Sequence, residues 1–253
     1  MIAFLQQLAL EAGQIALEAR VSLVEKNIHF KNEKDLVTDA DKRVEAFVFS
    51  RIKAAYPTHD IFGEETGRQT SGGEYCWVID PIDGTTSFVH DVPYYSVSIA
   101  LQQNGETILG AVYAPRLNEL FLAEKGAGAT LNGRRLQVSR REMKHALLAT
   151  GFACVRAGWK DNNLKYFNRI LPLVRDIRRC GSAAVDLAYV AAGRYDGFWE
   201  LNLQPYDYAA GVLLVTEAGG GVCDFTGGTD YTGKGIVAFN REIRDRLMAC
   251  LGD

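Results

Sequence analysis

The sequence predicts a mixed α/β fold, with an antiparallel sheet in the first half and strands alternating with helices in the second half. Two apolar runs, 96–101 and 107–113, flank Asn104-Gly105, a dipeptide typical of tight β-hairpins. After Arg141 the pattern changes, and short β-like runs alternate with stretches that carry apolar residues at helical spacing. With 253 residues, 47% of them hydrophobic, the chain can bury a substantial core.

Two helices are expected before the sheet. Apolar residues recur at helical spacing from Phe4 to Val24, which predicts the first helix. Thr38 is a good N-cap for the second helix, and Asp39 and Asp41 suit the positive end of its dipole. This second helix must end before Pro57.

Strands and further helices follow in chain order. In the first half we expect strands over 60–62, 76–80, 96–101, 107–113 and 119–123, with Pro81 ending the second of them and a flexible Gly-rich loop over 66–74. In the second half we expect strands over 147–150, 177–178, 197–200, 221–224 and 236–238, and helices over 164–174, 182–192, 206–218 and 241–251. The seam near 135–145 lacks a linker rich in Gly, Pro or Ser. We therefore predict one domain, 1–253, with sub-halves 1–140 and 141–253.

Composition and charge argue against several classes of protein. A net charge of −3 and a pI near 5.9 give no general attraction to nucleic acid, so no direct binding to it is expected. The N-terminal residues lack the features of a signal peptide and no apolar run approaches a membrane span, so we expect a cytoplasmic protein without a membrane partner. The five cysteines are scattered without a Cys-x-x-Cys pair, which argues against a disulfide framework or a thiolate zinc site.

The most informative stretch is Trp-Val-Ile-Asp-Pro-Ile-Asp-Gly-Thr-Thr, residues 77–86. Asp80 ends an apolar strand, and Asp83 follows three residues later. Two carboxylates at this spacing can flank Mg²⁺, which prefers oxygen ligands. Gly84 and Thr85 open what looks like a helix, and the amides at a helix start can bind phosphate. Carboxylates beside an anion-binding turn are what a metal-assisted phosphate hydrolase needs.

Further acidic residues fit the same chemistry. Glu64 and Glu65 follow the strand 60–62, and Asp207 lies in the first turn of an apolar helix. Taken singly, Asp83 and Asp207 could be helix caps, Glu64 and Glu65 an exposed turn, and Asp41 a partner of a helix dipole. Their occurrence together favours the metal-dependent hydrolase.

These residues resemble the inositol monophosphatase family, and the resemblance covers essentially the whole chain. It is carried by Gly63-Glu64-Glu65-Thr66, by the run from Trp77 to His90, by Gly181 to Ala188, and by Tyr206 to Gly211 followed by Thr216 to Gly220. The resemblance implies an alternating five-layer αβαβα sandwich, a homodimer, and a cluster of two or three magnesium ions that lithium can disrupt. It also implies direct attack on phosphorus by a metal-activated water, without a phosphoenzyme.

The resemblance further assigns roles to residues. Glu64, Asp80 and the carbonyl of Ile82 would hold the first metal, Asp80, Asp83 and Asp207 the second, and Glu64 a third. Thr85, oriented by Asp41, would position and deprotonate the attacking water together with Glu64, while the amides of Gly84 and Thr85 would bind the phosphate. Asp83, Ser182, Ala183 and Glu200 match positions that contact substrate hydroxyls, and Lys31, on a short loop with Glu33, and Glu65 match contacts near the metals. Tyr206 stands where the family usually has Trp, a change that could alter the packing around Asp207.

The leading hypothesis from the sequence is therefore a phosphatase that acts on inositol-1-phosphate or a similar small phosphorylated polyol. Fructose-1,6-bisphosphatase, histidinol-phosphatase and adenosine 3′,5′-bisphosphate nucleotidase activities use the same kind of site and stay open as alternatives. Arg178-Arg179 leave room for a bisphosphate substrate. A different class of function, contact with the transcription machinery, is implied by some bacterial relatives and is compatible with an intact site.

Overall fold

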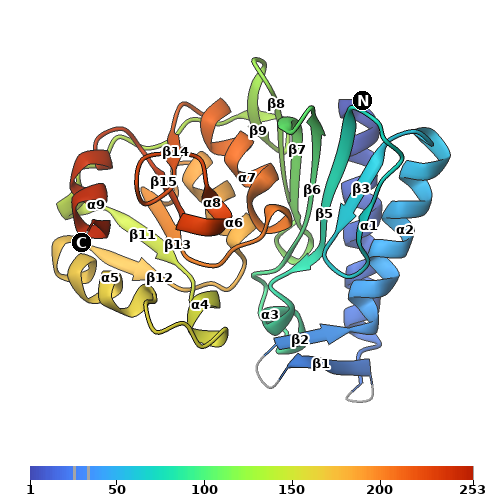
Figure 1. The fold of residues 1–253 in the computed structure, drawn as a ribbon, viewed down its shortest axis with the longest axis horizontal. Coiled ribbons are helices and arrows are strands. Elements are labelled where there is room, and N and C mark those ends of the chain that lie inside the picture. Colours follow the sequence, from blue (N-terminus) through green and yellow to red (C-terminus); the bar gives the residue numbers. More distant parts are fainter. Residues whose placement is uncertain (25–26, 33–34, 253) are drawn as a thin grey trace.

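The computed structural model describes residues 1–24, 27–32 and 35–252, and it confirms the expected layered α/β architecture (Figure 1). From right to left in Figure 1, a helix pair covers an eight-stranded sheet, a second helix pair separates that sheet from a five-stranded sheet, and outer helices cover the far face. The chain passes from one sheet to the other between Arg135 and Leu147. Within the described ranges, no helix is long and apolar enough to cross a lipid bilayer.

The outer helix pair is α1 (Ile2–Val21) and α2 (Asp39–Ala55), close to the predicted bounds. Leu5 and Leu8 of α1 are buried with Val48 of α2 in a core that also includes Ile99 of the sheet. The predicted cap of α2 is confirmed, because the Thr38 hydroxyl oxygen accepts a hydrogen bond from the Ala40 N–H at 3.1 Å. The strands β1 (Ile28–Asn32) and β2 (Asp35–Thr38) form a separate hairpin just before this helix.

The eight-stranded sheet has the order β10-β9-β8-β7-β6-β5-β3-β4. Its strands are β3 (Asp60–Gly63), β4 (Gly67–Gln69), β5 (Tyr75–Asp83), β6 (Ser96–Gln103), β7 (Glu106–Ala114), β8 (Glu119–Glu124), β9 (Gly128–Leu131) and β10 (Arg134–Arg135). The predicted hairpin is confirmed: β6 and β7 pair antiparallel, and Asn104 and Gly105 both have positive φ, 50° and 84°, as a tight hairpin turn requires.

Two details differ from the expectation for this sheet. The predicted loop over 66–74 contains the short strand β4, whose residues pair with β3. The strand β5 does not end at Pro81 but continues to Asp83, with a break in register against β6 between Asp80 and Asp83. Proline has no N–H to donate to the ladder, so the irregular segment accommodates it while Asp83 pairs again with Ser96.

The second half also follows the predicted alternation. The five-stranded sheet has the order β12-β11-β13-β15-β14, with β11 (Leu147–Thr150), β12 (Asp176–Arg178), β13 (Gly197–Glu200), β14 (Gly221–Cys223) and β15 (Ile236–Phe239). Its helices are α4 (Ala153–Arg156), α5 (Asn163–Ile170), α6 (Ala183–Ala191), α7 (Pro205–Glu217), α8 (Tyr231–Lys234) and α9 (Arg244–Leu251), of which α4 and α8 were not expected. The central pair α6 and α7 approach closely because Gly211 leaves room for the Leu187 side chain.

Candidate metal centre

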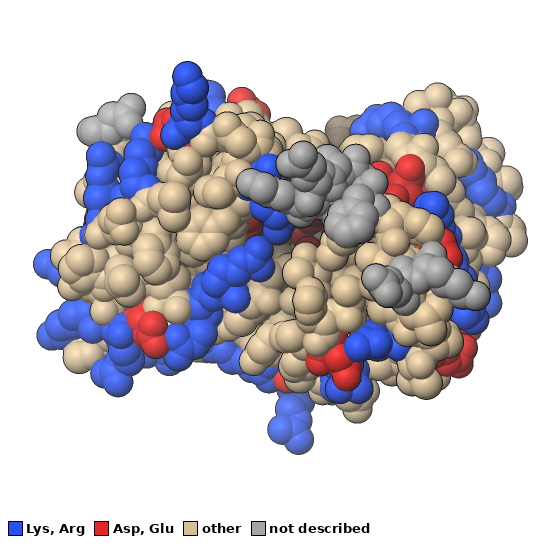
Figure 2. All heavy atoms as spheres, turned by 90° about the horizontal axis from the view of Figure 1, so that it is seen from below, with Lys and Arg blue, Asp and Glu red and all other residues tan. Residues whose placement is uncertain are grey.

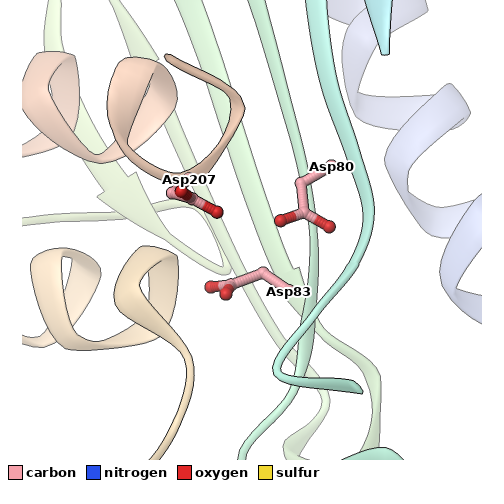
Figure 3. Close-up of side chains that lie close together, drawn as sticks. All are labelled: Asp80, Asp83 and Asp207. Atoms are coloured by element: carbon pink, nitrogen blue, oxygen red, sulfur yellow. The ribbon is translucent and has the colours of Figure 1, made fainter. Parts of the chain in front are cut away.

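Three aspartates meet where the central helix pair reaches the eight-stranded sheet. Asp80 and Asp83 come from the last residues of β5, and Asp207 comes from the first turn of α7. Each offers a carboxylate oxygen, and these oxygens all lie within 4.8 Å of one another (Figure 3). The fold therefore brings together the three carboxylates that the sequence pattern singled out.

Part of the hydrogen-bonding capacity of the three is used by the chain itself. Asp80 accepts from the Ile82 N–H at 3.0 Å, and Asp207 accepts from the Gln204 N–H at 2.6 Å. Asp83 accepts from the Ser182 hydroxyl at 2.5 Å and from the Ala184 N–H at 2.7 Å. The helix-cap interpretation is thus correct in part, because Asp207 caps its own helix and Asp83 receives a terminal N–H of α6. Each carboxylate still presents an oxygen to the others.

Burial and mutual repulsion make this cluster unfavourable for negative charge. Burial, followed by the charges of Glu64 and Asp83, holds the pKa of Asp80 well above its usual value. Burial raises the pKa of Asp83 to about 6, and burial with the charge of Asp83 holds the pKa of Asp207 well above its usual value. Within the described part of the chain, no ion pair is formed by Asp80, Asp83 or Asp207. Close, buried, oxygen-only ligands fit a hard divalent cation, which would relieve this repulsion.

A hydroxyl and a further carboxylate, that of the buried Asp41, lie next to the triad. The Oγ1 of Thr85 lies 3.4 Å from Asp41 Oδ1 and 3.2 Å from the carbonyl oxygen of Ile82. Asp41 caps α2 with its other oxygen, which accepts from the N–H and hydroxyl of Thr38. Burial raises the pKa of Asp41 to about 7. Asp41 therefore serves the helix cap and the site at once.

Gly84 makes the turn from β5 into the short helix α3 (Thr85–Val89). Its φ of 93° lies in the left-handed region, and a Cβ there would lie 2.9 Å from the Tyr94 carbonyl oxygen and 3.1 Å from that of Gly181. Only glycine fits this position without displacing backbone. The N–H groups that open α3 have no partner within the helix, so the amide of Thr85 is available to an anion.

Glu64 follows β3 directly and lines the same cavity as Asp83 and Asp207, although its oxygens are not within the 4.8 Å cluster. The turn that carries Glu64 is held by Glu45, a residue that the sequence did not reveal. The buried carboxylate of Glu45 accepts from the N–H of Glu65 at 3.0 Å and from that of Thr66 at 2.9 Å. A glutamate inside the helical stripe of α2 was the available signal, since a buried charge there needs partners.

A cavity of about 310 Å³ is lined by Asp83 and Asp207 of the triad and reaches the start of α6 and the last residues of β11 and β13. The predicted substrate contacts Ser182, Ala183 and Glu200 all line it. Burial raises the pKa of Glu200 to about 7, and its carboxylate accepts from the Ala153 N–H at 3.1 Å. Arg179, considered above for a bisphosphate substrate, lines the cavity as well, and so do Arg156 and Asp186, which the sequence pattern did not single out. Asp186 is buried one turn after Ala183 on α6, a helical spacing that could have pointed to it.

Lys31 and Tyr206 are two further residues that the family resemblance singled out. Lys31 lies on strand β1 and not on a loop, while its side chain, like the whole of Glu33, lies outside the described part of the chain. Tyr206 lines the cavity, and its ring packs edge-on against Phe62 with centroids 5.7 Å apart. The Tyr206 carbonyl oxygen accepts from the Ser98 hydroxyl at 3.3 Å, which links the start of α7 to the sheet.

Comparison with known proteins gives consistent results. The sequence model of the inositol monophosphatase family matches residues 1–251. The "Nus factor SuhB" of Pseudomonas aeruginosa is 46% identical over 251 residues, which are 96% of this chain and 92% of that protein. The "Inositol-1-monophosphatase" of Mesorhizobium japonicum is 38% identical over 244 residues, with the same two shares covered.

Solved structures match over nearly the full length as well. The extragenic suppressor protein suhB from Bartonella henselae has a TM-score of 0.92 at 39% identity, covering 99% of this chain and 98% of that one. Inositol monophosphatase from Anabaena has a TM-score of 0.89 at 39% identity, covering 99% and 94%.

Proposed function

This chain belongs to the inositol monophosphatase family, and we propose that it is a magnesium-dependent phosphomonoesterase acting on inositol-1-phosphate or a similar small polyol or sugar phosphate. The observation that carries the proposal is the buried triad of Asp80, Asp83 and Asp207, of which Asp83 and Asp207 line a cavity of about 310 Å³. A structural role alone would not require three carboxylates to share so little space against their mutual repulsion.

Asp80, Asp83 and Asp207 would hold the magnesium, with Glu64 and the carbonyl oxygen of Ile82 as additional ligands. When bound, magnesium supplies a Lewis acid that lowers the pKa of water and neutralises charge on the phosphoryl oxygens. Two or three ions per site, and lithium as an inhibitor, belong to the same proposal.

The residues around the triad would position the reactants. If the Thr85 hydroxyl donates its proton to Asp41, at 3.4 Å, its lone pairs face the site and can accept a hydrogen bond from the attacking water. Glu64, which lines the cavity, would share the task of orienting and deprotonating that water. The amides of Gly84 and Thr85 would hold the phosphate at the start of α3. A contact from Lys31 or Glu65 stays a prediction.

The rest of the cavity would bind the polyol. The carboxylates of Asp83 and Glu200 can accept hydrogen bonds from hydroxyls, and Ala183 offers its backbone. The Ser182 hydroxyl already donates to Asp83 at 2.5 Å, which supports a role in orienting Asp83 in addition to any contact with substrate.

The test is phosphate release from a panel of inositol-1-phosphate, fructose-1,6-bisphosphate, histidinol phosphate and 3′-phosphoadenosine 5′-phosphate, with and without Mg²⁺ and with Li⁺ added. Magnesium-dependent release that is strongest on inositol-1-phosphate and falls with Li⁺ is the expected result. Strongest release from another member would move the assignment to that alternative activity. Absence of release from all four would contradict the proposal.

We also propose a contact with the transcription machinery, because relatives 46% identical to this chain are Nus factors. Such a contact would use the outer surface of a cytoplasmic homodimer and would not need the metal centre. Affinity capture from a cell extract should then retain RNA polymerase or its factors equally with the Asp80→Asn variant. Light scattering in solution tests the dimer, and capture of none of these proteins would count against the second function.

A further inference from the structure

One buried carboxylate in the cavity has no hydrogen-bond partner. Asp186, on α6, is 2% exposed and lines the same cavity as Asp83 and Glu200. Its Oδ1 is buried without a partner, and neither of its oxygens makes a hydrogen bond or ion pair with another residue in the described part of the chain. Basic side chains gather beside the central hollow in Figure 2, whereas Asp186 lies beneath the surface. Such a group calls for a donor from outside the chain.

Structural roles do not account for Asp186. It lies in the first turn of α6, where an acidic residue complements the helix dipole. The Ser182 side chain already caps this helix by accepting from the Val185 N–H at 3.2 Å, so the cap does not need Asp186. An exposed acid would complement the dipole without the desolvation cost of a buried carboxylate that has no donors.

The charges around Asp186 decide which ligand suits it. Burial, followed by the charges of Glu200 and Asp83, holds the pKa of Asp186 well above its usual value, while the charge of Arg179 opposes this rise. The same Arg179 opposes the burial that raises the pKa of Glu200. The guanidinium near both carboxylates disfavours a further cation as ligand. Among the described residues, Asp186 also belongs to no group of acids close enough to hold a metal ion. A neutral hydroxyl is the donor that fits.

The neighbouring Glu200 has a free acceptor of the same kind. One of its oxygens accepts from the Ala153 N–H at 3.1 Å, and the other accepts no hydrogen bond from the described residues. Gly151, which follows β11 and lines the cavity, makes room for this carboxylate, because a Cβ there would overlap with it. Glu200 and Asp186 therefore both line the cavity with acceptor oxygens that the chain does not use.

We propose that Asp186 is a specificity-determining residue that accepts a hydrogen bond from a hydroxyl of the substrate, beside the hydroxyl contact of Glu200. This inference rests on the proposed phosphatase function and extends its contacts with the polyol. It gives the cavity a third acceptor carboxylate after Asp83 and Glu200, so a ring with several hydroxyls is preferred over a phosphate ester with few. The bound substrate supplies the donor that the fold withholds from Asp186.

The experiment is a double-mutant cycle that removes one partner from the protein and the other from the substrate. The substrates are inositol-1-phosphate and analogues that each lack one ring hydroxyl. We expect kcat/KM of the wild type to fall about tenfold or more for the analogue without the contacted hydroxyl, as for loss of a hydrogen bond to a charged group. Asp186→Leu, which keeps the branched shape without an acceptor, should lose a similar factor on the complete substrate and should not discriminate against that analogue. Asp186→Asn keeps one acceptor oxygen and should keep part of the discrimination.

Stability separates this binding role from a structural one. Replacing an unpartnered buried carboxylate with an apolar side chain should raise the urea midpoint of the metal-free protein, so Asp186→Leu should be more stable than the wild type. Asp245→Leu, at an exposed position of α9, is the matched control. It should change neither the urea midpoint nor the discrimination between the substrates.

Two results would overturn the role of Asp186. One is an Asp186→Leu variant that loses the same factor in kcat/KM on inositol-1-phosphate and on every analogue. The other is a variant with a lower urea midpoint and undiminished discrimination, which would make Asp186 a structural residue. A wild type that releases no phosphate from the four compounds of the panel would instead contradict the phosphatase. The same cycle would then use dissociation constants from calorimetry: coupling between Asp186 and one hydroxyl would support the contact, and its absence would overturn it as well.

Discussion

Buried aspartates in two regions of this molecule differ in how many hydrogen-bond donors the surrounding chain provides. Asp196, at the start of β13, is completely buried and accepts from the Ser139 hydroxyl, the Leu147 N–H at 2.7 Å, the Arg141 Nε at 3.0 Å and the Asn240 side-chain amide at 3.2 Å. A cation and three further donors thus compensate one carboxylate. Asp196 ties the segment before β11 to the end of β15, which is a structural task.

The triad is built in the opposite way. Asp80 accepts one hydrogen bond from the chain, the Ile82 N–H, and faces Asp83 and Asp207 across less than 4.8 Å. The fold thus satisfies Asp196 completely and leaves the triad in need of an external cation. The difference teaches that burial alone does not mark a functional carboxylate: the missing donors do.

The largest effect should come from Asp80→Asn. Losing one of the three carboxylates should lower kcat/KM at least about a hundredfold, as for other removed transition-state charges. The free energy of unfolding of the metal-free protein should rise, because one repelling charge is gone. Initial rates and urea titrations in EDTA measure the two quantities, with exposed Asp245→Asn as the control. A loss in kcat/KM smaller than about tenfold would make Asp80 an ordinary buried residue.

Asp196→Asn should give the reverse outcome. The variant loses the charge that pairs with Arg141, and its NH2 replaces one acceptor oxygen and faces buried donors, so we expect the free energy of unfolding to fall by about 3 kcal/mol. The kcat of the folded variant should stay near that of the wild type, because Asp196 does not line the cavity. Urea titration and activity at a temperature well below the transition check this. A stable but inactive variant would refute the division between the two regions.

Magnesium should stabilise the protein through the triad alone. At a concentration about a hundred times its dissociation constant, a ligand that binds only the folded state adds about 2.7 kcal/mol of stability. We therefore expect Tm to rise with Mg²⁺ in the wild type and in Asp196→Asn, and to stay constant in Asp80→Asn. An equal rise in all three proteins would show that the ion binds elsewhere.

The sequence predicts best what depends on local chemistry. Asn104-Gly105 and the Thr38 cap are recognisable because a few neighbouring residues determine each structure. Asp80, Asp83 and Asp207 could be grouped because their motifs are specific, and the fold does bring them together.

Features that depend on distant parts of the chain were not predictable. The strand β5 continues past Pro81 because β6 offers Ser96 to Asp83, and Ser182 is engaged by the same Asp83 across 99 positions of sequence. Arg156 comes to line the cavity only after α4 has packed. Nothing local distinguishes it from other surface arginines.

The smallest expected effect concerns the pH dependence of stability, to which two buried carboxylates, Asp224 and Asp83, contribute with opposite sign. Burial raises the pKa of Asp224, but hydrogen bonds from Thr226 and Gly228 lower it more, from the usual 3.8 to about 2. Its stabilisation is present above the unfolded value and is lost as the pH falls through 3.8 toward 2. Asp83 behaves in reverse: its folded pKa of about 6 means that stability of the metal-free protein is lost as the pH rises from 3.8 to about 6.

Urea midpoints in EDTA, measured for the wild type, Asp224→Asn and Asp83→Asn, would resolve the two contributions. In a plot of urea midpoint against pH, Asp224→Asn should weaken the fall at acid pH. Asp83→Asn should weaken the fall that occurs as the pH rises toward neutrality. Magnesium should remove only the fall in urea midpoint toward neutral pH, since a bound cation lets the triad ionise without repulsion. If magnesium instead changed the fall at acid pH, the contrast between Asp224, which the fold satisfies, and Asp83, which is left for a cation, would not hold.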